Sequence, residues 1–296
     1  MNLAAIDIGS NAVRLFIVRV IKELNQHSFK TIEFVRVPMQ LGEDVFNLGK
    51  IGPEKETQFI DLIRSFKTLI KSYEVQDYMA CATSSLREAS NGNDIAKKIK
   101  KELGIQIDIL DGPGESEIIF QAVLRRIDYR DYLHVEVGGG STDLNIISNH
   151  KKVTSQSFNI GTLRQSDQKQ NKEEWVNMRT WVKFKTKSYK ELLAIGTGGN
   201  IAKIYSLANI KDNQHMSLNK MTDVIHLIKN RTLEERVNIL KLNPDRAELI
   251  IPASDIYLSI LRWANISKIV VPNVGLKEGI IQMLYSRVLT KETVEI

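Results

Sequence analysis

The hydrophobic positions in the first part of the chain follow a strand-like pattern that is interrupted by tight turns. Residues 3–8 are apolar except for one acid, residues 9–11 have the composition of a turn, and residues 12–20 resume an apolar strand pattern. Residues 29–37 alternate well enough for another strand. The chain is therefore predicted to open with strands on both sides of a turn that contains glycine.

Later segments change to the period of a helix. Apolar residues recur at helical spacing over residues 54–72, and residues 93–103 form a lysine-rich helical pattern that ends at Gly104. A third helix is predicted over residues 115–126, after a loop at 111–114. The short apolar runs at 78–83 and 105–110 predict buried strands between these helices.

The opening pattern returns near the middle of the chain. Residues 132–137 predict a strand that carries an acid, Glu136, at the same offset from a glycine-rich turn as Asp7, and residues 143–147 predict the return strand. Two copies indicate a duplicated domain rather than a repeat array. A third glycine-rich segment, residues 196–200, follows a strand and precedes a helix. The rest is predicted to be mainly helical, with a last short strand near 269–271.

Composition excludes several classes of protein. A length of 296 residues suggests about two domains, and the single cysteine, Cys81, excludes an intramolecular disulfide and favours a small buried side chain. The N-terminus lacks the pattern of a signal peptide and no window has the length of a membrane span, so a cytoplasmic protein is expected. The net charge of +6 fits either an anionic partner or an ordinary basic surface.

Common catalytic signatures are missing from the sequence. It contains no G-x-S-x-G elbow, no H-E-x-x-H, no Walker A loop and no G-x-G-x-x-G after the first strand. The five histidines have no ligand spacing, so each is interpreted as a surface or structural residue. What remains is three glycine-rich turns, each directly after a strand, where backbone amides are able to bind phosphate.

Acidic residues beside these turns suggest metal-assisted phosphoryl transfer. Asp7, Glu136 and Asp143 are candidate ligands of a hard cation such as Mg²⁺. Glu115, at the start of a helix, is a candidate general base for water, and Arg87 is a candidate phosphate ligand. Taken singly, each residue also has an ordinary structural interpretation. The three candidate ligands fit as carboxylates at strand ends, Glu115 fits as an acid in the first turn of a helix, and Arg87 fits as a surface arginine.

Five segments together carry a family resemblance. They are D-I-G-S-N at 7–11, A-T-S-S-L-R at 82–87, E-V-G-G-G-S-T-D at 136–143, G-T-G-G at 196–199 and G-L-K-E-G at 275–279. In this order the sequence resembles the exopolyphosphatase / guanosine pentaphosphate phosphatase family, a branch of the sugar kinase, Hsp70 and actin superfamily. The resemblance extends from about residue 3 to residue 282.

This resemblance implies an α/β fold of two ribonuclease-H-like (actin-like ATPase) domains, with mixed sheets flanked by helices and a cleft between the domains. The expected domains are residues 1–125 and 126–282, with a helix at about 283–296 that packs back on the first domain. The chain is expected to be a short form that lacks the C-terminal helical domain of longer members.

The resemblance also assigns roles to individual residues. Glu115 matches the catalytic base, and Glu136 and Asp143 match the metal-binding acids. The residue pattern by itself makes Asp7 a third candidate metal ligand. The positions that match phosphate contacts are Asp7, Ser10, Asn11, Arg87, Gly138, Gly139, Gly140, Ser141, Thr142, Gly196, Thr197, Gly198 and Gly199. The family usually has Asp at position 136, Glu at position 143 and Ser at position 12.

The expected function is an exophosphatase that hydrolyses the terminal phosphate of inorganic polyphosphate or of pppGpp by metal-assisted attack of water. Mg²⁺ or another divalent cation is the expected cofactor, and the expected partners are polyphosphate or guanosine penta- and tetraphosphate, with no membrane and no specific nucleic acid. A homodimer is compatible with this interpretation. Two alternatives remain open: an ATP-dependent phosphotransferase, and a non-catalytic sensor of polyphosphate or of a guanosine alarmone.

Two lysine-rich segments remain outside these motifs. Basic residues gather in the first with interleaved aromatic side chains, and four lysines form the second. They are interpreted either as solvated helix faces or as a path for a polyanion. The basic residues are Arg179, Lys183, Lys185, Lys187 and Lys190, and Lys97, Lys98, Lys100 and Lys101.

Overall fold

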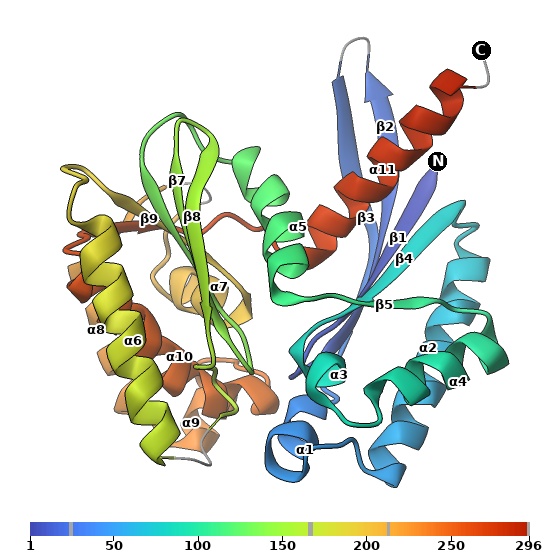
Figure 1. Ribbon diagram of the computed structural model, residues 1–296, viewed down its shortest axis with the longest axis horizontal. Coiled ribbons are helices and arrows are strands. Elements are labelled where there is room, and N and C mark those ends of the chain that lie inside the picture. The colour runs from blue at the N-terminus through green and yellow to red at the C-terminus, as the bar shows by residue number, and fades with distance from the viewer. Residues whose placement is uncertain (24–25, 165–167, 212–213, 295–296) are drawn as a thin grey trace. The chain divides into compact units, whose positions relative to one another are not determined.

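The computed structural model describes residues 1–23, 26–164, 168–211 and 214–294. The chain divides into two compact units, of which unit 1 comprises Met1–Ala122 and Gly275–Ile296 and unit 2 comprises Val123–Val274. Each unit contains one mixed sheet with helices packed against it (Figure 1). The expected α/β architecture with two mixed sheets is therefore confirmed.

The sheet of unit 1 has the strand order β3-β2-β1-β4-β5. Neighbours β3, β2 and β1 are antiparallel, whereas β1, β4 and β5 run parallel. The strands are β1 (Asn2–Ile8), β2 (Val13–Glu23), β3 (Gln26–Val37), β4 (Asp77–Ala82) and β5 (Ile107–Ile109). The helices are α1 (Leu41–Leu48), α2 (Pro53–Ser72), α3 (Ser84–Glu88), α4 (Gly92–Leu103), α5 (Gly112–Leu124, of which the last two residues belong to unit 2) and α11 (Leu276–Val294).

Alternation along β1 sends its side chains into two layers. Ala4, Ile6 and Ile8 share one buried cluster with apolar residues of α2 and α4, while α11 packs on β1 and β4. Helices α5 and α11 meet closely, because a Cβ built on Gly279 would lie 2.3 Å from the carbonyl oxygen of Ile118. Glycine at this position lets the two backbones approach, which holds the first turns of α5 against the rest of unit 1.

The sheet of unit 2 has the strand order β10-β11-β9-β6-β7-β8. Its strands are β6 (Tyr132–Val137), β7 (Thr142–Ser148), β8 (Lys151–Phe158), β9 (Leu193–Thr197), β10 (Met216–Ser217) and β11 (Lys268–Val270). Its helices are α6 (Gln168–Thr186), α7 (Gly199–Leu207), α8 (Leu218–Lys229), α9 (Leu233–Asn238) and α10 (Pro244–Trp263). Helix α10 packs against α6, α7, α8, α9 and β6, and its buried face completes the main apolar core of this unit.

The two sheets confirm the predicted internal repeat. In each, three antiparallel strands are followed by two parallel ones, so that β3-β2-β1-β4-β5 corresponds to β8-β7-β6-β9-β11. The turns also correspond, because Gly9 N–H donates to the Ala12 carbonyl at 3.1 Å and Gly138 N–H donates to the Ser141 carbonyl at 2.8 Å. The strand register therefore assigns each strand position in one unit an equivalent position in the other.

Four elements differ from the sequence expectations. Helices α1 and α3 are short and were not predicted, and strand β8 lies at a sheet edge with mostly exposed or half-exposed residues, so its sequence has no apolar alternation. Helix α5 begins at Gly112, inside the expected loop. Asp111 accounts for this early start, because its carboxylate accepts the Gly114 N–H at 2.7 Å and its carbonyl accepts the Glu115 N–H at 3.0 Å.

Cys81 lies in the interior of β4 and is fully buried. Burial, followed by the charge of Asp108, raises the pKa of its thiol to about 12. The thiol is therefore protonated and packs as a small apolar side chain, as the sequence indicated. In the described part of the chain, no helix has the length and hydrophobicity that crossing a membrane requires.

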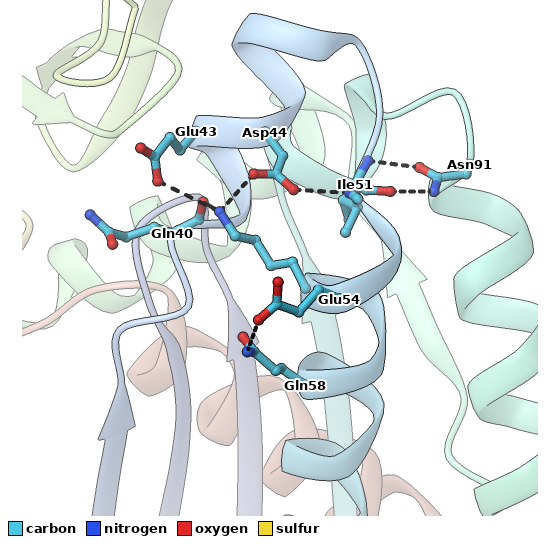
Figure 2. Close-up of polar contacts among 9 residues, drawn as sticks. Gln40, Glu43, Asp44, Ile51, Glu54, Gln58 and Asn91 are labelled. Atoms are coloured by element: carbon cyan, nitrogen blue, oxygen red, sulfur yellow. Dashed lines mark hydrogen bonds and ion pairs between the residues drawn. The ribbon is translucent and has the colours of Figure 1, made fainter.

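A polar cluster joins α1 to the start of α2 (Figure 2). The Lys55 ammonium donates to Asp44 at 2.7 Å and to the Gln40 carbonyl at 3.1 Å, and the second carboxylate oxygen of Asp44 accepts the Gly52 N–H at 2.9 Å. Burial opposes ionisation of Asp44, but the Lys55 and Gly52 hydrogen bonds outweigh it, so the pKa of Asp44 lies below its usual value.

Because the folded pKa of Asp44 is lowered, its carboxylate stabilises the fold above the unfolded pKa of about 4, and this contribution is lost as the pH falls through the folded value. We expect Asp44→Asn to reduce the free energy of unfolding at pH 7 by about 1–2 kcal/mol, and the difference to shrink towards pH 3. Urea titrations at both pH values measure it. Asp61→Asn, which removes an exposed ion pair with Arg64, is the matched control with little change. An equal loss at both pH values would contradict the assignment.

Candidate active site

The Gly138–Ser141 turn of unit 2 has its carbonyl groups held on one side. The Gly138 carbonyl accepts the Thr162 N–H at 3.0 Å, the Gly139 carbonyl accepts the Leu163 N–H at 2.9 Å, and the Gly140 carbonyl accepts the Arg164 Nε–H. No described peptide bond is cis, so each following N–H points opposite to its carbonyl. The N–H groups of residues 139, 140 and 141 therefore all point away from residues 162–164, which is the arrangement of an anion-binding nest.

Gly161 makes this arrangement possible, although the sequence analysis did not single it out. A Cβ at this position would lie 2.3 Å from the Gly139 carbonyl oxygen and 2.6 Å from the Gly140 carbonyl carbon. These are backbone atoms and cannot rotate away. The signal in the sequence was a Gly-Thr pair at 161–162, but its importance depends on a contact between two loops that are about twenty residues apart.

The second glycine-rich loop of unit 2 connects β9 to α7. Gly198 adopts φ +103°, a conformation that favours glycine, and the next residue begins the helix. The Tyr257 hydroxyl, from α10, lies 2.7 Å from the Thr197 carbonyl and 3.1 Å from the Val135 carbonyl, and so ties the ends of β9 and β6 together. Burial, and then the charge of Glu136, raise the pKa of Tyr257 well above its ordinary value, so this hydroxyl stays a donor.

Arg246 is a further basic residue at this loop that the sequence analysis missed. Its guanidinium lies against Gly199, where a Cβ would come within 2.8 Å of Nη2. Arg246 comes from the first turn of α10, almost fifty residues further along the chain. A positive charge beside backbone amides at the start of α7 favours an anion there.

Glu136 and Asp143 are directly opposite each other on β6 and β7. Side chains opposite each other on antiparallel strands lie on the same face of the sheet, and Asp143 also accepts the Ser141 hydroxyl at 3.2 Å. Like charges at such a pair are unfavourable, whereas carboxylate oxygens are the ligands that a divalent cation prefers. The donor set of these two residues therefore fits a hard cation.

Asp7 has different surroundings in unit 1. It is buried and its carboxylate forms an ion pair with Arg14 at 2.8 Å. The register of the repeat makes Arg14 the counterpart of Asp143, so the unit 1 pair is charge-compensated where the unit 2 pair is doubly acidic. Among the residues that the structure describes, no group of three or more His, Cys, Asp or Glu side chains forms a metal-binding cluster.

Ser10 and Asn11 occupy the turn between β1 and β2. The Ser10 and Ser84 hydroxyls lie 2.8 Å apart, the Ser10 carbonyl accepts the Gly42 N–H at 2.8 Å, and the Asn11 carbonyl accepts the Gln40 N–H at 3.0 Å. Helix α1 therefore supports this turn as residues 162–164 support the turn of unit 2. With its carbonyls held in this way, the turn directs the Asn11 N–H away from α1.

Arg87 and Glu115 are brought together in unit 1. Arg87 Nη1 donates to the Leu110 carbonyl at 2.7 Å and lies 3.4 Å from the Glu115 carboxylate, and about a quarter of the Arg87 side chain remains exposed. Arg87 comes from α3, directly after β4, and Glu115 from the first turn of α5. The structure thus pairs the predicted base with the predicted phosphate ligand.

The lysine-rich segments lie on helix surfaces, except for Lys187 and Lys190, which follow the end of α6. Lys98 of α4 pairs with Glu56 at 2.8 Å, and that hydrogen bond raises the pKa of Lys98. In α6, Trp175 and Trp181 pack against the core of unit 2, whereas Phe184 is exposed beside Lys185. The interleaved aromatic residues are thus divided between core and surface, and do not form one exposed platform.

Two compact α/β units with mixed sheets, glycine-rich turns and strand-end carboxylates define a protein of the actin-like ATPase fold. Comparison with known proteins makes the class specific. The family model "Ppx/GppA phosphatase family" matches residues 20–289. The chain therefore belongs to the Ppx/GppA phosphatase family, and it is a hydrolase that acts on phosphoanhydride bonds.

Relatives are consistent with this membership, and solved structures share the fold. Exopolyphosphatase 1 of Mycobacterium leprae is 22% identical over 303 residues, which cover 95% of this chain and 88% of the relative. The crystal structure of an exopolyphosphatase from Cytophaga hutchinsonii matches with a TM-score of 0.81 at 21% identity, covering 96% of this chain and 97% of that one. The Aquifex aeolicus Ppx/GppA phosphatase matches with a TM-score of 0.72 at 23% identity, covering 95% and 98%.

Proposed function

We propose that this protein is an exophosphatase that releases the terminal phosphate of inorganic polyphosphate. The observation that carries the proposal is the set of three outward amides at Gly139, Gly140 and Ser141, next to the Glu136–Asp143 pair. A terminal phosphoryl group has several anionic oxygens, which suit such a nest. The exopolyphosphatase from M. leprae and the one from C. hutchinsonii support polyphosphate as the substrate class, and pppGpp is a second substrate to be tested.

A divalent cation, Mg²⁺ in this proposal, is held by Glu136 and Asp143. When bound there, it would supply positive charge that neutralises phosphoryl oxygens. Asp7, already paired with Arg14, is the third carboxylate that the residue pattern suggested as a metal ligand, and its participation is part of the proposal.

The residues of each unit have their own proposed roles. Glu115 accepts the proton of the attacking water, and Arg87 binds a phosphoryl oxygen through its planar guanidinium. Ser10 and Asn11 of unit 1 bind phosphate oxygens through the turn that α1 supports. In unit 2, the amides of residues 139–141 and the Gly196–Gly199 loop donate to the charge that spreads over the phosphoryl oxygens in the transition state. The Gly138 N–H and the Thr142 hydroxyl donate to the Ser141 and Ile160 carbonyls, so these two residues shape the turn.

The experiment is release of inorganic phosphate from tripolyphosphate, long-chain polyphosphate and pppGpp. We expect activity that EDTA abolishes and Mg²⁺ restores, and we expect Glu136→Gln and Asp143→Asn each to raise the Mg²⁺ concentration for half-maximal rate by about tenfold or more. Glu234→Gln, on the surface of α9, is the matched carboxylate control with an unchanged metal requirement.

The outcomes separate the proposal from its alternatives. Full activity in EDTA would contradict the metal, and binding of tripolyphosphate without turnover under any divalent cation would make the protein a sensor. Phosphate transfer from ATP that depends on an acceptor would make it a phosphotransferase.

A further inference from the structure

A buried polar network crosses three adjacent strands of unit 2. His134 Nε2 lies 2.8 Å from the Thr197 hydroxyl, and His134 Nδ1 lies 3.0 Å from the Asn145 side-chain nitrogen. Each of the three side chains belongs to a residue that is about 1% exposed. They come from β6, β7 and β9, and Thr197 is in register with Glu136 at the end of the sheet where the two glycine-rich turns begin.

Unit 1 provides an internal comparison, because its sheet repeats the same register. The counterparts of His134 and Asn145 are Ala5 and Phe16, and the counterpart of Thr197 is Cys81. All three counterparts are buried and apolar or weakly polar. The fold therefore does not require polar side chains at these positions. Burying such groups costs free energy unless they are hydrogen-bonded, so the network in unit 2 calls for a reason besides architecture.

The hydrogen bonds determine which ring nitrogen carries the proton. The Asn145 amide nitrogen is a donor, so Nδ1 of His134 accepts and carries no proton. A neutral imidazole then carries its proton on Nε2, which donates to the Thr197 hydroxyl oxygen. Because Nδ1 accepts a hydrogen bond and carries no proton, the buried ring is the neutral imidazole.

These hydrogen bonds determine what the Thr197 hydroxyl is able to do. The hydroxyl has one proton and two lone pairs. Because its oxygen accepts the hydrogen bond from His134, its own proton remains for donation to another acceptor. The Thr197 carbonyl is fixed by Tyr257 at 2.7 Å, so the backbone that carries this hydroxyl is also held. The hydroxyl belongs to the Gly196–Gly199 loop, which the proposed function assigns to phosphate.

We propose that His134 is a positioning residue that orients the Thr197 hydroxyl as a hydrogen-bond donor to a phosphoryl oxygen of the substrate, with Asn145 fixing the imidazole tautomer. This inference rests on the proposed phosphate-binding role of the Gly196–Gly199 loop. His134 itself does not touch the substrate, and it acts through one hydroxyl. The same network makes the donor rigid before the substrate arrives, which reduces the ordering cost of binding.

The test is a double-mutant cycle between positions 134 and 197. The variants are His134→Leu, Thr197→Val and the double variant, and two readouts are taken: the Kd for tripolyphosphate by calorimetry, and kcat and KM for its hydrolysis. We expect each single variant to weaken tripolyphosphate binding by about tenfold, because a hydrogen bond to a charged group is lost or misdirected. The double variant should be no weaker than Thr197→Val alone, because His134 acts only through that hydroxyl.

Further variants separate positioning from folding. His134→Gln places an amide N–H near the position of Nε2 and should bind tripolyphosphate within about threefold of the wild type. His134→Leu with Asn145→Leu replaces both buried polar groups by apolar ones; it should recover the thermal unfolding midpoint lost in His134→Leu while binding remains about tenfold weaker. His226→Gln, on the exposed face of α8, is the matched histidine control.

The outcomes distinguish this inference from the proposed function. Losses that add in the double variant, or a double-leucine variant that binds like the wild type, overturn the inference and leave the phosphatase proposal standing. A wild type that binds tripolyphosphate without hydrolysing it overturns the phosphatase proposal, while the Kd cycle still decides the role of His134. A wild type that neither binds nor hydrolyses tripolyphosphate overturns both.

Discussion

Replacing Glu115 with glutamine is expected to reduce the kcat for polyphosphate hydrolysis by about 10²–10⁴-fold, because the attacking water loses its general base. Glutamine has the size of glutamate and still offers an oxygen to Arg87, whose guanidinium lies 3.4 Å from the Glu115 carboxylate. Binding of tripolyphosphate should therefore stay within about threefold of the wild type. Phosphate release and calorimetric binding on the same preparation measure the two effects.

The neighbouring surface of α5 supplies the control for this prediction. Glu117 is exposed two residues further along and accepts a hydrogen bond from Gln121, so Glu117→Gln changes the same charge without touching Arg87. We expect that variant to keep the wild-type rate. A Glu115→Gln enzyme with more than a tenth of the wild-type kcat would assign the base to another residue.

The second large effect is expected at Gly161. Alanine there would place its Cβ 2.3 Å from the Gly139 carbonyl oxygen and 2.5 Å from the Gly139 carbonyl carbon, so one of the two backbone segments must move. Movement of this turn redirects the amides of residues 139–141, and a displacement of about 1 Å in a positioning group costs about 10²-fold in rate. We therefore expect kcat/KM to fall about 10²-fold and binding of tripolyphosphate to weaken.

A glycine with open space around it provides the comparison. No atom lies within 4 Å of a Cβ built on Gly112, at the start of α5, so Gly112→Ala should leave both readouts unchanged. Thermal unfolding of both variants shows whether Gly161→Ala acts through global stability. If Gly161→Ala binds tripolyphosphate and turns over like the wild type, residues 138–141 do not form the phosphate nest.

Much of the site was visible in the sequence because it depends on local patterns. The offset between an acid and a glycine-rich turn is short-range information, and it placed Asp7 and Glu136 at equivalent strand ends. The pairing of Glu136 with Asp143 also follows locally, since a tight turn fixes the register of the strands that it joins. Helices with strong periodicity, such as α2, were predicted within one residue at their start.

Other parts of the site were hidden because they depend on contacts between distant segments. Nothing near Gly161 in the sequence signals that the Gly139 carbonyl lies against it, and Arg246 reaches its loop from another helix. The ion pair of Asp7 with Arg14 was missed for a related reason: register places the two side chains opposite each other, but only the folded sheet shows which charge compensates which.

The sequence by itself determined the repeated strand-turn-strand unit, the residue types of the proposed chemistry and the family resemblance, since these reside in periodicity, turn composition and order along the chain. Tertiary structure decided which side chains have partners. It gave Asp7 an arginine, joined Arg87 to Glu115, and buried His134 between Asn145 and Thr197. The physical reason is that a hydrogen bond or an ion pair depends on distance and burial, and both are set by packing between segments far apart in the sequence.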